Sequence, residues 1–108
     1  MKKNVVQEKS FDFAVRIVRL FQHLKKNKRE FVISKQIIRS GTSIGANIEE
    51  AIGGSSKRDF LAKLKISYKE ARETKYWLRL LHETDYLETN EFESISEELL
   101  IANRNRLC

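Results

Sequence analysis

The positions of glycine and proline constrain the fold of this chain most. Proline is absent, and the only four glycines lie between residues 41 and 54, so residues 1–40 and 55–108 contain neither residue type. All-β folds need frequent tight turns, and these rely on glycine and proline. The sequence therefore favours long helices joined by few turns. Its 108 residues are enough for one domain with one modest core.

Four segments have the apolar spacing of amphipathic helices. In the first, two neighbouring stripes begin at Phe11 and at Phe13, and Ser10 is the expected N-cap. The outer stripe comprises Phe11, Ala14, Val18 and Phe21, and the inner stripe comprises Phe13, Ile17, Leu20 and Leu24. Two stripes are more than a helix on the surface of a small monomer needs, which indicates a second buried face.

The other three helices are expected at 30–51, at 55–85 and from 90 to near the C-terminus. Ser55 or Ser56 is the expected cap of the third helix, and Asn90 followed by Glu93 resembles a capping box at the start of the fourth. Short connections between long helices favour antiparallel neighbours. The predicted fold is an all-α, antiparallel, up-down-up-down four-helix bundle. It forms a single domain over residues 1–108, in which residues 1–9 are a mobile basic arm.

The segment RSGTSIGANIEEA, residues 39–51, contains two glycines but lacks the pattern of a phosphate-binding loop. Gly41 and Gly45 are one residue too close for that loop, Ala46 stands where it has lysine, and no strand precedes the segment. Within a helix the two glycines share one face. Each costs about 1 kcal/mol of helix propensity relative to alanine, so we expect a closely packed neighbouring helix to compensate.

A polar stripe runs along the same helix. Antiparallel pairing about the glycines at 53 and 54 places Arg39 opposite Glu70 and Glu73, which predicts a semi-buried ion pair, and places Glu50 near Arg58. Paired charges on helices are usually structural, so we interpret the set as a structural polar network that fixes helix register. Its members are Arg39, Ser43, Asn47, Glu50, Glu70 and Glu73.

The segment FVISKQIIRSGTSIGANIEEAIGGSSKRDFLAKLKISYKEARETKYWLRLL, residues 31–81, carries a specific combined pattern. Its matching residues are Arg39, Ser40, Ser43, Ile44, Asn47, Glu50, Ala51, Phe60, Glu70, Glu73, Thr74, Tyr76, Trp77 and Leu78. With this pattern, residues 11 to about 100 resemble the 23S rRNA intervening-sequence proteins. The resemblance implies an antiparallel four-helix bundle, a homopentamer and no established catalytic activity. It also implies kinship with the accessory protein of diversity-generating retroelements, which is thought to bind reverse transcriptase and nucleic acid.

Apolar residues on the third helix also indicate that the chain forms an oligomer. Together with the outer stripe of the first helix, they exceed what one small core needs, and exposed they would form a large apolar patch. Aromatic side chains are favoured anchors of interfaces. The candidate oligomer interface on this helix consists of Tyr76, Trp77 and Leu80.

The sequence lacks the residue patterns of an enzyme. Its two histidines, His23 and His82, have no neighbours at metal-ligand spacing, and Ser40 and Ser43 have no plausible base close in sequence. Cys108 is the only cysteine, which excludes an internal disulfide or a cysteine-based metal site. No stretch approaches the ~20 apolar residues of a membrane span. We expect a cytoplasmic, non-enzymatic protein without a metal or cofactor.

Basic residues cluster in a pattern that favours nucleic-acid binding. One cluster lies in the first turn, and a second continues along about four turns of one face of the third helix. A phosphate backbone could follow such a face, and repetition in an oligomer would multiply the contacts. No aromatic residue is expected between the lysines among these cations, and no RNA-binding motif is present, so base-specific recognition is not indicated. The candidate residues are Lys25, Lys26, Lys28, Arg29, Lys65, Lys69, Arg72, Lys75 and Arg79.

Two other interpretations remain open at the level of sequence. Residues 83–98 contain seven acids and no Lys or Arg, and with the basic arm they could recruit a protein partner or pair subunits. The chain would then be an assembly or adaptor protein, or a product with no strongly selected biochemical role. Exposure of Lys65, Lys69, Arg72 and Arg79 together on the surface of the oligomer favours RNA or a ribonucleoprotein as the partner. Occupation of these cations by acids of a neighbouring subunit favours assembly.

Overall fold

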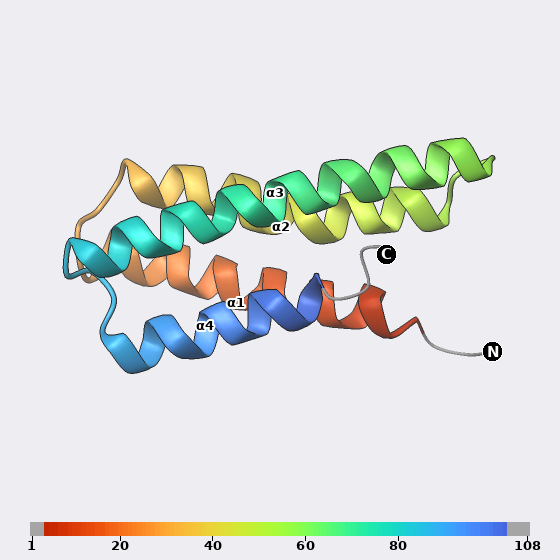
Figure 1. Cartoon of the computed structure of the whole chain (residues 1–108). Helices are drawn as coiled ribbons and strands as arrows, with labels where there is room; N and C mark the ends of the chain where they lie inside the picture. The colour runs from red at the N-terminus through yellow and green to blue at the C-terminus, as the bar shows by residue number, and fades with distance from the viewer. Residues whose placement is uncertain (1–3, 104–108) are drawn as a thin grey trace.

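The computed structural model describes residues 4–103, which form four antiparallel helices (Figure 1). The helices are α1 (Val5–Lys26), α2 (Ile33–Ile52), α3 (Lys57–Glu83) and α4 (Thr89–Ala102). No strand occurs among the described residues, so the predicted all-α, up-down-up-down bundle is confirmed. None of the four helices in this part of the chain combines the length and apolar character needed to cross a membrane.

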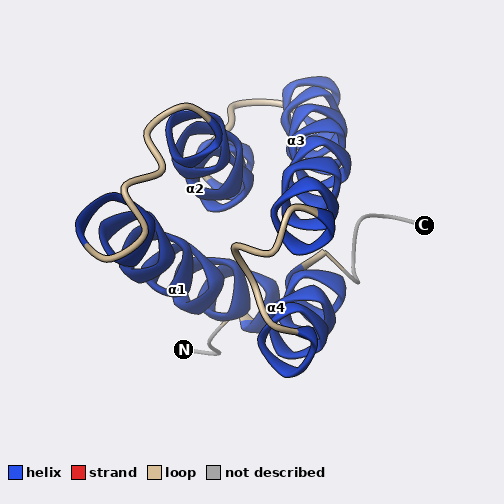
Figure 2. Ribbon diagram, turned by 90° about the vertical axis from the view of Figure 1, so that its left-hand side faces the viewer, coloured by secondary structure: helices blue, strands red, loops and turns tan. Residues whose placement is uncertain are grey.

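The helices form a ring in which α1 packs beside α2 and α4, and α3 also packs beside α2 and α4 (Figure 2). Helices α1 and α3 are therefore diagonal to each other, and their outer faces point in different directions. The short helix α4 covers only part of α3, so the α2–α3 hairpin extends beyond the rest of the bundle at one end (Figure 1).

The start of α1 differs from the sequence prediction. Asn4 is the N-cap, because its Oδ1 accepts a hydrogen bond of 3.0 Å from the backbone N–H of Gln7. Ser10 is buried inside the helix, where its hydroxyl donates to the Gln7 carbonyl at 3.1 Å. The predictions of a Ser10 cap and of a mobile arm through residue 9 were wrong, since residues 5–9 are helical. Lys2 and Lys3 lie outside the described residues.

Carboxylates begin two of the other helices. The buried Glu30 accepts hydrogen bonds of 2.9 and 2.7 Å from the backbone N–H groups of Ile33 and Ser34. Glu88 forms a capping box with Glu91 at the start of α4, two residues before the predicted Asn90. Leu87, only 3% exposed, explains the earlier start, because α4 begins just after this side chain enters the core.

The other predicted boundaries are closer to those observed. Ser56 caps α3 as expected, and its hydroxyl accepts a hydrogen bond of 3.0 Å from the backbone N–H of Asp59. Gly53 is the C-cap of α2. Helix α3 ends at Glu83, two residues before the predicted end.

The core uses the inner stripe of α1. Phe13, Ile17 and Leu24 have no exposed surface, whereas Phe11 on the outer stripe is 64% exposed. The inner side chains meet apolar residues from the other three helices in one cluster. The cluster includes Ile37, Ile44, Ile48, Ala71, Leu78, Leu81, Ile95, Leu99 and Ala102. Within one chain, the outer stripe therefore remains partly open to solvent.

The two glycines of the segment 39–51 allow α1 and α2 to pack closely, as predicted. A Cβ atom at Gly41 would lie 2.8 Å from Cγ2 of the buried Ile17. A Cβ atom at Gly45 would lie 3.2 Å from the backbone oxygen of Ser10. The neighbour that compensates for the lost helix propensity is therefore α1.

Replacing Gly41 with alanine is expected to destabilise the bundle. Alanine gains about 1 kcal/mol of helix propensity, but overpacking a well-filled core costs about 1–3 kcal/mol, and the fully buried Ile17 would have to shift to admit the new Cβ atom. We expect Gly41→Ala to lower the free energy of unfolding by about 1 kcal/mol net. Urea unfolding measures this, with Gly53→Ala as control, because a Cβ there meets only a carbonyl oxygen at 3.7 Å. An increased stability of Gly41→Ala would show that Ile17 moves aside without cost.

Candidate nucleic-acid interface

Helices α2 and α3 are joined by a surface ion-pair network centred on Arg39. Its Nη1 lies 3.2 Å from Oε1 of Glu70, and its Nη2 donates to Oε2 of Glu73. Trp77 Nε1 donates to the same Glu73 oxygen at 3.0 Å. The hydrogen bond from Arg39, and next the one from Trp77, hold the pKa of Glu73 below its usual value. The predicted pairing is confirmed, and it is partly buried, because the Arg39 side chain is 49% exposed and those of Glu70 and Glu73 are 21% and 36% exposed.

The other members of the predicted network behave differently. Ser43 and Asn47 hydrogen-bond to carbonyl groups of their own helix, at 2.6 and 2.8 Å. Glu50 pairs with Lys63 of α3 at 2.8 Å, so the predicted proximity to Arg58 was wrong by more than a turn. The polar stripe therefore fastens α2 to α3 at its two ends, at Arg39 and at Glu50.

Buried hydroxyl groups fix the rotation of α3 against α2. The Thr74 hydroxyl donates to Ser40 Oγ at 2.9 Å, and the Ser67 hydroxyl donates to the Ile44 carbonyl at 2.9 Å. Sequence analysis did not identify these two contacts as links between the helices. Because both hydroxyls are satisfied and point into the bundle, they determine which residues of α3 face outward.

The outward face of α3 carries the predicted cations. The buried residues of α3 lie on its other side and are Ser67, Ala71, Thr74, Leu78 and Leu81. Roughly opposite them lie Lys65, Lys69, Arg72, Lys75 and Arg79, all exposed; we call these five residues the basic face. Among residues 4–103, no member of the basic face takes part in an ion pair. The structure thus brings five cations together on one helix.

The acids of α4 do not neutralise the basic face within one chain. Glu98 pairs with Arg16 of α1 at 2.8 Å, and the same guanidinium nitrogen donates to Ser94 Oγ at 2.8 Å. Within residues 4–103, α4 therefore forms an interhelical ion pair with α1 and none with α3. This leaves the cations of α3 available to an external anion.

Tyr76 also lies on the basic face, four residues after Arg72 and three before Arg79. It is 56% exposed, so an aromatic side chain lies between the two arginines, a feature not predicted from the sequence. Its helical spacing to the two arginines was the signal in the sequence that we missed. Trp77 is half-buried against the core, and Leu80 is partly exposed beside it.

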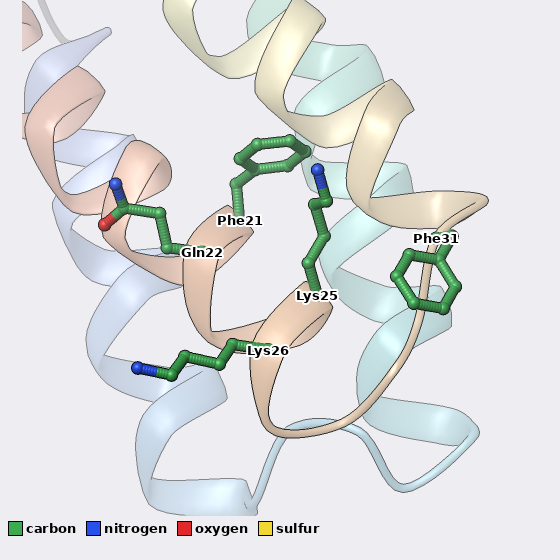
Figure 3. A pocket seen from close by; sticks show the side chains of 5 residues that line it. All are labelled: Phe21, Gln22, Lys25, Lys26 and Phe31. Carbon is green, nitrogen blue, oxygen red and sulfur yellow. The ribbon is translucent and has the colours of Figure 1, made fainter.

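The basic residues of the first turn form a separate cluster. Lys25, Lys26, Lys28 and Arg29 are all exposed. The Lys25 ammonium lies 4.8 Å from the ring centroid of Phe21, and both side chains line a shallow hollow with Phe31 at the α1–α2 connection (Figure 3). Because α1 is diagonal to α3, Lys25 and Lys26 do not belong to the basic face.

The histidines have ordinary local partners. His23 Nδ1 lies 3.1 Å from Asn27 Oδ1. His82 stacks on Phe92 with ring centroids 4.4 Å apart, and its Nε2 lies 3.2 Å from Thr89 Oγ1. Over residues 4–103, no three His, Cys, Asp or Glu side chains are grouped as metal ligands. Cys108 lies outside the described residues.

The fold agrees with comparisons to known proteins. A family model described as 23S rRNA-intervening sequence protein matches residues 2–104. The chain belongs to this family. A solved relative of this 23S rRNA-intervening sequence protein is a protein of unknown function from the S23 ribosomal protein family of Bacteroides thetaiotaomicron VPI-5482. It is 51% identical, with a TM-score of 0.93 over 95% of each chain. A search of curated proteins found no match.

Proposed function

We propose that this 23S rRNA-intervening sequence protein is a non-enzymatic, oligomeric bundle that binds RNA or another nucleic acid through the basic face of α3. The observation that carries the proposal is the set of five exposed cations without an ion pair among residues 4–103. From Lys65 to Arg79 the helix rises about 21 Å. That length matches roughly six phosphates along one strand of a duplex.

The charge of the whole chain supports the same partner. Its formal net charge is +6, and nucleic-acid backbones attract basic surfaces whatever their sequence. A helix face of Lys and Arg tracks phosphates, so we propose binding with little preference for sequence. This function requires a compartment that contains RNA, which fits the cytoplasmic location expected from the sequence.

Self-association is the second part of the proposal. On the outer stripe of α1 and beside it, Phe11 is 64% and Val15 is 37% exposed. Exposed apolar residues gathered on one helix are typical of surfaces that another subunit covers. We therefore propose that subunits associate through the outer face of α1, and the interface expected from the sequence at Tyr76, Trp77 and Leu80 stays a prediction. The pentamer that the family resemblance implies remains a prediction.

Fluorescence anisotropy of labelled RNA, measured over a salt series with the assembled protein, tests the proposal. If all five cations of one subunit contact phosphates of a single strand, the logarithm of the binding constant should fall against that of the salt concentration with a slope of about −3.5. A slope near zero would contradict binding by the basic face. No binding at low salt would favour the alternative function, an adaptor that recruits a protein partner without nucleic acid.

A further inference from the structure

Tyr76 gives the basic face a feature that phosphate binding does not need. It is 56% exposed and lies in the middle of a charged surface. Arg72 lies one turn before it and Arg79 lies three residues after it, so cations flank the ring along the helix. An external polyanion that contacts both arginines must pass the phenol ring.

The ring is also held in place. Tyr76 meets Trp77 in an edge-to-face contact, with centroids 5.0 Å apart and an interplanar angle of 74°. Trp77 is itself fixed by its hydrogen bond to Glu73 and by packing against the core. A ring braced in this way loses little conformational freedom when a ligand covers it. Tyr76 is therefore organised in advance to receive a flat partner.

We infer that the basic face of this protein binds single-stranded nucleic acid, and that Tyr76 stacks on an unpaired base while the flanking arginines contact phosphates. The inference rests on the proposed nucleic-acid binding and adds the class of strand. Aromatic rings stack on any base of a single strand, because every base presents a flat face. In a duplex the bases stack on each other, so Tyr76 has no base face to contact.

The charge around Tyr76 argues against a two-fold subunit contact at the same place, whereas a cyclic pentamer would pair this face with a different surface of its neighbour, which the sedimentation comparison below distinguishes. In a two-fold contact, Lys69, Arg72, Lys75 and Arg79 would face the same cations of a second copy. Juxtaposed like charges across an interface cost several kcal/mol. A polyanion satisfies these cations and the aromatic ring together.

The test compares a short labelled oligouridine with duplex RNA of the same length, using the assembled protein at low salt. Tyr76→Ala and Tyr76→Leu should weaken binding of oligouridine at least about fivefold, whereas Tyr76→Phe, which keeps the ring, should stay within about twofold of the unmodified protein. All three variants should bind the duplex within about twofold of the unmodified protein, because its phosphates remain accessible to the same cations. Leucine keeps the apolar bulk without the aromatic face, so it separates stacking from simple burial.

The other outcomes overturn the inference in distinguishable ways. If the unmodified protein binds neither probe, the proposed function fails, and the inference with it. If it binds both and the variants bind oligouridine normally, nucleic-acid binding stands but stacking by Tyr76 is wrong. If the Tyr76 variants lose the same affinity for oligouridine and for duplex RNA, the inferred preference for single strands is wrong. If Tyr76→Ala lowers the oligomeric mass in sedimentation equilibrium while Tyr76→Leu keeps it, the residue belongs to a subunit interface instead.

Discussion

Reversing three charges of the basic face, in the variant Lys65→Glu/Lys69→Glu/Arg72→Glu, is expected to lower the affinity for RNA by about 100-fold or more at low salt. Each lost phosphate contact removes the release of one counterion, and each new carboxylate repels the backbone. All three residues are exposed and none is in an ion pair among residues 4–103, so the fold should tolerate the changes. Anisotropy titrations over a salt series measure both the affinity and its salt dependence.

The control for this variant must carry the same change in net charge. Lys9→Glu/Arg19→Glu/Lys35→Glu alters three exposed cations on α1 and α2, outside the basic face and outside the first-turn cluster. The two variants are compared at equal oligomeric state, verified by sedimentation equilibrium, because Arg19 lies one turn after Val15 on the outer face of α1. The control should bind RNA much more tightly than the α3 variant, although less tightly than the unmodified protein, because long-range attraction weakens with net charge. An equal loss of affinity in both variants would mean that RNA responds only to net charge. The basic face would then not be the site.

Replacing Phe13 with alanine is expected to lower the free energy of unfolding of the bundle by a large fraction. Phe13 has no exposed surface and lies in the core cluster formed by all four helices. Truncating a buried phenylalanine to alanine costs about 3–5 kcal/mol, through lost burial and the cavity that remains. Small domains have only about 5–15 kcal/mol of unfolding free energy in total. Urea unfolding followed by far-ultraviolet circular dichroism should show a much lower midpoint.

Phe11→Ala is the matched control, since the two phenylalanines are two residues apart on α1. Phe11 is 64% exposed in the single chain, and its truncation should change the free energy of unfolding by about 0.5 kcal/mol or less, at equal oligomeric state. If Phe11 lies in a subunit interface, the same variant should dissociate more readily in sedimentation equilibrium. A large loss of stability for Phe11→Ala in the monomer would mean that the outer stripe is part of the core.

The long-range pairing of α2 and α3 could be predicted because it depends only on where the hairpin bends and on the rise of each helix per residue. The absence of proline and the glycines at 53 and 54 determined where the hairpin bends. From this bend, helical rise alone placed Arg39 opposite Glu70 and Glu73, which is where the structure pairs them. The partner of Glu50 was misplaced because it lies close to the bend, where the residues of the connection shift the register.

Helix starts were harder to predict, because several nearby polar residues can cap the same helix. Asn4 and Ser10 both have side chains suited to an N-cap, and only the burial of Ser10 against α2 decides between them. Glu88 begins α4 because Leu87 must enter the core, and the tertiary contact outweighs the preference for Asn90. The position of Tyr76 among the cations follows from the rotation of α3, and its assignment to a subunit interface stays a prediction.

Because α1 and α3 are diagonal to each other, the outer face of α1 could contact another subunit while the basic face of α3 stays exposed. Subunits joined through the outer face of α1 would leave every basic face at the rim of the assembly, free to engage one long strand. Once one subunit holds the strand, its neighbours meet further phosphates at high effective concentration, so avidity can exceed the affinity of a single site by about 10²–10⁴. A weak contact between each subunit and the strand would then be sufficient for tight binding. The strand would dissociate only when several of these contacts break at the same time.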